Sequence, residues 1–270
     1  MTVIFNSIEE FQAQHQHCVA TIGKYDGMHL GHQQILQNLL AESRRLELPA
    51  VVILSEPQPE EFFAGDRAPS RLSSFWEKVD FLRGFGVDIV FRLHFDKRLS
   101  QYAPERFIRE ILCAGLGIKS LVTGEDFRFG KDRAGDFSLL QDLAVKHDYA
   151  VKQVPDFCLL GERISSTLVR HYLQGHDLNK VEQLLGRPYS ISGEVVKGRQ
   201  LGRQLGTPTA NVMLNARELS LTGIYTVEVL IRGQVFSGVA SIGYRPTVDD
   251  DADPLLEVHL LDFDAELYGV

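Results

Sequence analysis

The chain has few cysteines: three among its 270 residues, Cys18, Cys113 and Cys158. Because this number is odd and the spacing is wide, the cysteines predict neither a disulfide framework nor a C-x-x-C metal or redox motif. Proteins of a reducing compartment keep their thiols free, so a cytoplasmic location fits the chain best.

Long apolar runs are also missing from the sequence. A run such as Ala50–Leu54 is far too short to cross a bilayer, and the residues after Met1 lack the basic and apolar segments of a secretory signal. Internal repeats and low-complexity tracts are absent as well. We therefore expect no membrane partner.

Net positive charge is the third absence. The chain carries 28 Lys and Arg against 36 Asp and Glu, a formal charge of −8, so we expect no nucleic-acid partner. A ligand that carries phosphate must be held by a local group of residues, because the overall charge repels it. With 44% hydrophobic residues, the chain can build the core of one large or two medium domains. This composition excludes a disordered, collagen-like or coiled-coil protein.

Short apolar runs alternate with amphipathic segments up to about residue 185. Five runs are predicted strands: Val19–Gly23, Ala50–Leu54, Asp88–Leu93, Ser120–Gly124 and Tyr149–Val154. Three segments have helical apolar spacing: Gln33–Leu46, Pro104–Leu116 and Phe137–His147. Strands separated by helices need crossover connections, which predicts an α/β domain over residues 1–185 with a Rossmann-like, doubly wound parallel sheet. Ligands bind such sheets beyond the carboxyl ends of the strands.

The pattern changes near residue 186, after a short helical segment, Leu178–Leu185. Four β-rich segments follow: Ile191–Val196, Ile224–Ile231, Val235–Ile242 and Leu255–Phe263. Arg232–Gln234 predicts a tight connection between two of them. The sequence thus predicts a second domain over residues 186–270, built as a small antiparallel β-barrel or sandwich.

A glycine-rich segment, G-K-Y-D-G-M-H-L-G-H at residues 23–32, joins the first predicted strand to the first helix. Its glycines permit close backbone approach, and the helix start offers N–H groups to an anion. Two imidazoles three residues apart, His29 and His32, can donate to the same phosphate. A surface or helix-capping role is an open alternative, whereas a zinc site lacks a third ligand at a recognisable spacing.

The same segment resembles the G-x-F-D-G-x-H-x-G-H motif of bacterial FAD synthetases, which are H-x-G-H nucleotidyltransferases. Three more segments follow the order of that family: Glu56–Pro59 as E-P-Q-P, Gly124–Gly130 as G-x-D-F-R-F-G, and Ile164–Arg170 as I-S-S-T-x-x-R. Other segments look like a riboflavin kinase module: Gly193–Gly198, Gly206–Asn211, Gly238–Gly243 and Leu256–Leu260. Over nearly its whole length, the chain resembles the bacterial bifunctional riboflavin kinase/FMN adenylyltransferases.

The resemblance implies FAD biosynthesis from small-molecule substrates, with ATP as co-substrate and Mg²⁺ as cofactor. Riboflavin would be phosphorylated to FMN, and FMN would receive an adenylyl group to give FAD and pyrophosphate. In adenylyl transfer, His29, His32 and Arg170 would be catalytic. ATP would be bound by Gly23, Asp26, Gly27, Gly31, Ser165, Ser166 and Thr167, and the flavin by Pro57, Gln58, Pro59, Asp126, Phe127 and Arg128.

The residues also allow structural roles at these positions. Ser165–Thr167 can form a helix N-cap, which is compatible with phosphate binding. Phe127 and Phe129 can be core residues, and we expect packing roles for Phe62 and Phe63.

In the kinase module, the resemblance implies that Glu257 acts as the base that deprotonates the ribityl hydroxyl. The ATP loop would consist of Lys197, Gly198, Gly202 and Arg203. Thr209 and Asn211 would bind Mg²⁺ and the ATP phosphates through oxygen ligands. Without the resemblance this region is a Gly-rich turn, because it does not match the usual P-loop pattern.

The sequence departs from the family pattern at several positions, among them Lys24 for asparagine, Thr207 for an aromatic residue and Ser241 for asparagine. Members of the family also continue beyond the position of Val270, so we expect an incomplete kinase module with weak or absent kinase activity. Three alternatives remain: an FAD synthetase with an inactive kinase module, another adenylyltransferase of the superfamily, and a flavin- or nucleotide-binding protein without catalysis. The sequence does not indicate the oligomeric state.

Overall fold

The structure is a computed structural model that describes residues 2–159, 161–197, 208–214, 219–244 and 254–269. It divides into two compact units, each described here by itself. The first comprises Met1–Ala68, Phe75–Leu168 and Leu184–Gly186, and the second comprises Pro69–Ser74, Val169–Gln183 and Arg187–Val270. The domain boundary expected after residue 185 stays a prediction.

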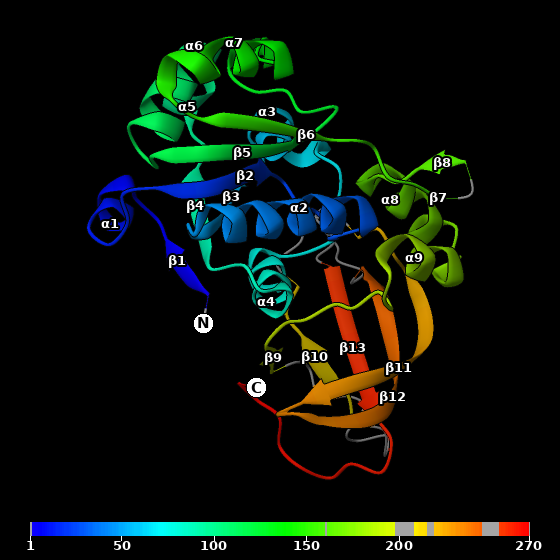
Figure 1. Cartoon of the computed structure of the whole chain (residues 1–270). Coiled ribbons are helices and arrows are strands. Elements are labelled where there is room, and N and C mark those ends of the chain that lie inside the picture. The colour runs from blue at the N-terminus through cyan, green and yellow to red at the C-terminus, as the bar shows by residue number, and fades with distance from the viewer. Residues whose placement is uncertain (1, 160, 198–207, 215–218, 245–253, 270) are drawn as a thin grey trace. The chain divides into compact units, whose positions relative to one another are not determined.

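A six-stranded parallel sheet forms the centre of the first unit (Figure 1). Its strands are β1 (Val3–Phe5), β2 (Cys18–Gly23), β3 (Ala50–Glu56), β4 (Ile89–His94), β5 (Ile118–Gly124) and β6 (Ala150–Val154). They pair in the order β1-β4-β3-β2-β5-β6, and every pair is parallel. This confirms the predicted doubly wound α/β fold. The sequence pattern missed β1 because three residues are too few to display a period.

Helices cover both faces of this sheet (Figure 1). The longer ones are α2 (Leu30–Leu46), α4 (Phe75–Phe85) and α7 (Phe137–His147). Shorter elements are α1 (Ile8–Gln12), α3 (Pro59–Ala64), η1 (Gly65–Arg67), α5 (Lys97–Ser100), α6 (Pro104–Phe107) and η3 (Lys131–Arg133). The helix expected over Pro104–Leu116 forms as α6 followed by a π-helical segment, η2 (Ile108–Cys113).

Strand β3 shows why the sheet needs two helical layers. Its alternate residues Val52 and Leu54 belong to the same core cluster as Leu36 of α2, while Val51 and Ile53 lie in the cluster on the other face. All seven residues of β3 are buried, as is typical of a parallel strand with both faces covered. Burial of each such side chain stabilises the fold by about 1.5–3 kcal/mol, which fixes the carboxyl ends of the strands in place.

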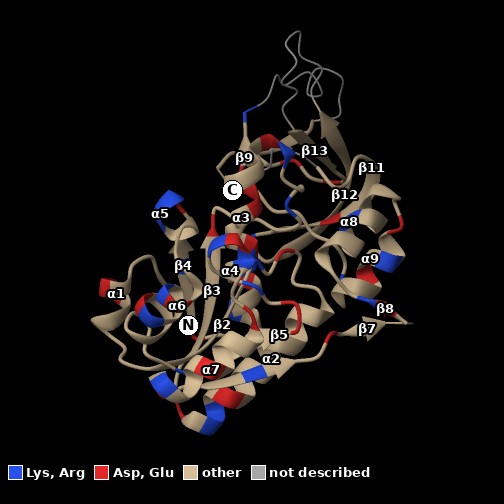
Figure 2. Ribbon diagram, turned by 90° about the horizontal axis from the view of Figure 1, so that it is seen from above, with Lys and Arg blue, Asp and Glu red and all other residues tan. Residues whose placement is uncertain are grey.

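Beyond β6 the chain forms a short antiparallel pair, β7 (Cys158–Leu159) with β8 (Glu162–Arg163), and then two helices. These are α8 (Ser166–Gln174) and α9 (Leu178–Leu185). Among the residues described, none of the helices is long and apolar enough to span a bilayer. Figure 2 shows acidic and basic positions interspersed on surface helices such as α7.

The second unit contains a five-stranded antiparallel sheet, paired in the order β11-β12-β13-β10-β9. Its strands are β9 (Val195–Val196), β10 (Ala210–Val212), β11 (Gly223–Ile231), β12 (Gln234–Tyr244) and β13 (Pro254–Leu260). This confirms the predicted antiparallel β module. Of the segment expected as a strand over Ile191–Val196, only the last two residues are in a strand, β9. The sequence did not predict β10, because its pairing with β13 is a contact between segments far apart in the chain.

The turn between β11 and β12 was predicted correctly. Arg232 and Gly233 adopt φ values of 48° and 82°, the left-handed conformation that a two-residue hairpin turn requires.

Candidate functional site

The loop between β2 and α2 has a closely defined backbone. Three of its residues are left-handed: Tyr25 at φ 50°, Gly27 at φ 81° and Met28 at φ 48°. Tyr25 and Met28 are buried, and the Tyr25 hydroxyl lies 2.6 Å from Oγ1 of Thr21. Packing and this hydrogen bond offset the cost of the unusual dihedrals, so the loop follows one path at the carboxyl end of β2.

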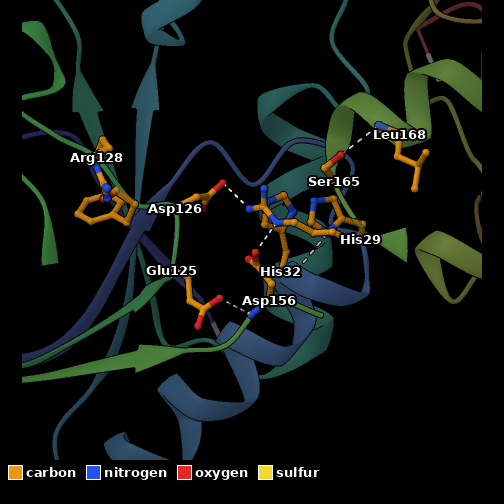
Figure 3. Close-up of polar contacts among 10 residues, drawn as sticks. His29, His32, Glu125, Asp126, Arg128, Asp156, Ser165 and Leu168 are labelled. Carbon is orange, nitrogen blue, oxygen red and sulfur yellow. Dashed lines mark hydrogen bonds and ion pairs between the residues drawn. The ribbon is translucent and has the colours of Figure 1, made fainter. Parts of the chain in front are cut away.

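His29 and His32 lie together where α2 begins (Figure 3). His29 is the N-cap residue, and its Nδ1 accepts the backbone N–H of His32 at 3.3 Å. The two rings stack at a centroid distance of 3.7 Å and an interplanar angle of 15°. The capping role left open by the sequence is therefore present, and it leaves the His29 proton on Nε2.

Both imidazoles are held in the neutral form. Burial lowers the pKa of His29 to about 4, and the positive charge of Arg163 acts in the same direction. Burial also holds the pKa of His32 well below its usual range, and the positive charges of Lys24 and Lys78 act in the same direction, as would a proton on the neighbouring His29. Nδ1 of His32 is buried and has no hydrogen-bond partner among the described residues. At neutral pH the pair can offer uncharged N–H donors to a ligand.

The I-S-S-T segment meets this loop. Ser166 Oγ donates to the carbonyl oxygen of Asp26 at 2.9 Å, and Asp26 is buried. Ser165 Oγ accepts the Leu168 N–H at 3.2 Å, which makes it the N-cap of α8 (Figure 3). Thr167 is exposed beside them. Two helix starts, those of α2 and α8, are thus tied to one loop.

Gly31 is a place where a side chain would disturb the histidines. A Cβ at this position would lie 3.2 Å from both Cε1 and Nδ1 of His29. Gly23 is restricted in a similar way, since its Cβ would lie 3.0 Å from the Tyr25 ring. These two predicted ATP-binding glycines therefore shape the loop.

Arg163 was missed by the sequence reasoning. Its Nη2 contacts Asp126 at 2.5 Å and its Nε contacts Asp156 at 2.6 Å, and Figure 3 shows both carboxylates converging. The signal available in the sequence was a cation directly before the I-S-S-T segment. The structure thus connects the predicted flavin residue Asp126 to the environment of His29.

The neighbouring residues of the G-x-D-F-R-F-G segment are divided between core and surface. Phe129 is buried and its ring stacks with that of Phe127 at 5.4 Å, which supports core packing for both. Arg128 is exposed, and its Nη1 donates to the Phe127 carbonyl at 2.9 Å (Figure 3).

In the E-P-Q-P segment, Gln58 is buried and directly precedes α3. Its backbone N–H donates to Glu61 at 2.9 Å, whereas its Nε2 has no partner within the described parts of the chain. Pro57 and Pro59 flank it and are half-buried. Phe62 and Phe63 pack edge-to-face with Phe95 yet remain 39% and 66% exposed, so the packing expected for them is incomplete.

Arg170 belongs to the second unit. Its Nε donates to the carbonyl oxygen of Ser70 at 2.6 Å, and the hydroxyl of Ser70 pairs with that of Ser220 at 2.5 Å. The catalytic role expected for Arg170 stays a prediction.

The second unit also brings together residues of the predicted kinase site. Glu257 of β13 is directly opposite Asn211 of β10 and, on its other side, opposite Ser241 of β12, so the three share one face of the sheet. Asn211 is buried, and its Oδ1 lacks a partner in the part of the chain that the structure describes. Thr209 is exposed two residues before Asn211.

The predicted ATP loop is only partly visible. Lys197 places its Nζ 5.6 Å from the centre of the Tyr268 ring. Gly198, Gly202 and Arg203 lie outside the described residues, as does Thr207.

Comparison with known proteins accounts for both units. The FAD synthetase family model matches residues 11–168, and the riboflavin kinase family model matches residues 185–270. A bifunctional riboflavin kinase/FMN adenylyltransferase of Pseudomonas fluorescens is 46% identical over 265 residues, which are 98% of this chain and 85% of the relative. The protein of that name from Escherichia coli K12 is 47% identical, over 96% of this chain and 82% of its own length.

A similar solved structure is known as well. A crystal structure described as a macrolide-efflux protein from Streptococcus pneumoniae aligns with a TM-score of 0.82 and 27% identity, covering 99% of this chain and 87% of that one.

Proposed function

The chain belongs to the bifunctional riboflavin kinase/FMN adenylyltransferase family, and we propose that its two units divide two successive reactions between them. It is an enzyme of FAD biosynthesis, which phosphorylates riboflavin to FMN with ATP and transfers an adenylyl group from ATP to FMN. The first unit would carry adenylyl transfer and the second the kinase reaction. The observation that carries the first assignment is the stacked, uncharged pair of His29 and His32 at the start of α2.

In adenylyl transfer, a phosphate oxygen of FMN attacks the α-phosphorus of ATP, and the bond to the leaving pyrophosphate breaks. Negative charge accumulates on the non-bridging oxygens, so prepositioned donors lower the barrier, by about 3 kcal/mol for one well-placed donor. His29 would donate from Nε2, because its Nδ1 already accepts the His32 N–H. Since both histidines are neutral at pH 7, they would stabilise this charge as uncharged N–H donors.

The helix starts would hold the phosphates. Backbone N–H groups at the beginning of α2 and the hydroxyls of Ser166 and Thr167 on α8 suit a polyphosphate. Ser166 is tied to the Asp26 carbonyl, which supports a common site for both helix starts. We assign Arg170 to the pyrophosphate as a cation.

The flavin would lie against the segments that follow β3 and β5. Gln58 supports this assignment because its buried Nε2 lacks a partner within the described residues and can donate to a flavin carbonyl. Pro57 and Pro59 would form an apolar wall, and Asp126, Phe127 and Arg128 would line the other side. The link from Asp126 to Arg163 holds this second segment in place.

In the kinase unit, Glu257 would accept the proton of the ribityl hydroxyl that attacks the γ-phosphorus of ATP. Asn211 and Thr209 fit Mg²⁺, since the unpartnered Oδ1 and the exposed hydroxyl are hard oxygen donors. The ion would neutralise charge on the ATP phosphates. The ATP loop would be formed by Lys197 with Gly198, Gly202 and Arg203. The three free cysteines support a cytoplasmic location.

Product analysis tests both assignments. The purified chain is incubated with Mg-ATP and either riboflavin or FMN, and the flavins are separated by chromatography. Because the riboflavin kinase family model matches residues 185–270, we expect FMN and then FAD from riboflavin, and FAD from FMN, and not the weak or absent kinase activity expected from the sequence. FAD from FMN with no FMN from riboflavin would instead support an adenylyltransferase with an inactive kinase module.

Variants separate the two sites. Replacing His29 and His32 by Ala should abolish FAD formation and leave FMN formation intact, whereas His94→Ala, at an exposed histidine of β4, serves as the matched control. Full FAD synthesis by the double variant would remove both histidines from the mechanism.

A further inference from the structure

Lys78 of α4 is unusual because its side chain is fully buried. Its Nζ lies 3.1 Å from Oε1 of Glu56 and donates to the carbonyl oxygen of Lys24 at 3.1 Å. Glu56 is the last residue of β3 and is only 5% exposed, while Lys24 follows β2 directly. One ammonium group thus connects a helix, the end of a central strand and the loop that carries the histidines.

Stability alone does not explain this pair. Removing two charges from water costs several kcal/mol for each ion, and replacing a buried pair by apolar residues of similar size is often neutral or stabilising. On α4, the neighbouring buried positions Val79 and Leu82 are indeed apolar. The pair lies at the carboxyl edge of the sheet, where ligands bind in this class of fold.

The pair acts on the histidine loop in two ways. By binding the Lys24 carbonyl, Lys78 fixes the peptide that precedes the left-handed Tyr25. Its charge also favours neutral His32, together with the charge of Lys24. The centroids of the Tyr25 and His32 rings lie 5.0 Å apart. Because Lys78 is buried, it cannot reach a substrate and acts only through these neighbours.

We propose that Lys78 is a positioning residue for adenylyl transfer, whose ammonium group, paired with Glu56, holds the Lys24 carbonyl and the loop that presents His29 and His32. This inference rests on the adenylyltransferase function proposed for the first unit. It adds two residues, from α4 and β3, that support the catalytic loop from inside the protein.

The experiment compares Lys78→Met and the double variant Lys78→Met/Glu56→Gln with wild type in the full chain. The double variant leaves no unpaired charge behind and keeps the test valid if the single variant does not fold. Arg83→Met on the same helix is the matched control, because the Arg83–Asp80 pair is exposed. FAD formation from FMN and FMN formation from riboflavin are both measured on each protein.

We expect kcat for FAD formation to fall at least tenfold in both Lys78 variants, with FMN formation within twofold of wild type and no change in the control. Loss of the Lys78 charge should also move the acid limb of the FAD-forming rate to higher pH, since His32 then protonates more readily. A purely structural role would not move this limb.

Two results would overturn the proposal. One is a folded double variant that makes FAD at the wild-type rate with an unchanged pH profile. The other is failure of both variants to fold, which would make the pair a determinant of folding. Absence of FAD formation in wild type would instead refute the underlying adenylyltransferase function.

Discussion

The buried neutral state of His29 predicts a specific loss of stability in acid. Its pKa is lowered to about 4 from the ordinary value of 6.5. In the unfolded chain His29 binds a proton as the pH falls through about 6.5, whereas in the folded chain it resists protonation until about pH 4. Acid therefore stabilises the unfolded state relative to the folded state. The resulting loss of folding stability is complete only below the pKa of His29 in the folded chain.

The size of the effect follows from the difference between the two pKa values. A pKa that lies about 2.5 below its ordinary value corresponds to about 3 kcal/mol at about 1.36 kcal/mol per pKa unit. Most of this, about 2 kcal/mol, should already be lost at pH 5. His32 is shifted in the same direction, so wild type loses at least this amount.

Urea unfolding at several pH values measures the effect, with fluorescence of the single tryptophan, Trp76 of the first unit, as the reporter. His29→Asn removes the titrating group and supplies a preferred N-cap side chain. His94→Asn, at an exposed position, is the control. Between pH 7 and pH 5 the variant should lose about 2 kcal/mol less than wild type. Parallel pH dependences of wild type and His29→Asn would refute a buried neutral His29.

Three substitutions test other parts of the two sites. Gly31→Ala brings a Cβ to 3.2 Å from the His29 ring, so the rate of FAD formation should fall several-fold. This should happen even though alanine stabilises a helix by up to about 1 kcal/mol relative to glycine. An unchanged rate would show that the position of the His29 ring is not critical. Ser166→Ala removes the hydrogen bond to the Asp26 carbonyl, so it should lower the free energy of unfolding in urea by about 1 kcal/mol and raise KM for ATP. If neither quantity changed, the proposed link between the two helix starts would be contradicted. Glu257→Gln should abolish FMN formation from riboflavin while FAD formation from FMN continues, and loss of both would contradict its assignment to the kinase reaction alone.

Much of the fold followed from local pattern. The strands β2 to β6 were predicted to within about two residues because each is a short apolar run between amphipathic helices. Their parallel pairing followed because helical crossovers allow little else. The segment from Gly23 to His32 was likewise recognisable, since its glycines and histidines are adjacent in the chain.

Contacts between distant segments could not be predicted in this way. The pattern of α4 gave no reason to pair Lys78 with Glu56, 22 residues earlier, or to place its ammonium on the Lys24 carbonyl. Arg163 is 37 residues from its partner Asp126, and these meet only because the sheet brings the ends of their segments to one edge.

The sequence by itself determined the classes of structure and chemistry: a parallel α/β unit, an antiparallel β unit, and a histidine loop suited to phosphate. Only the tertiary structure decided the protonation of that loop and the residues that support it. The physical reason is that periodicity and motifs describe neighbours along the chain, whereas burial and charge pairing depend on neighbours in space. His29 can cap a helix by its position in sequence, but its neutral state comes from burial and from the charge of Arg163.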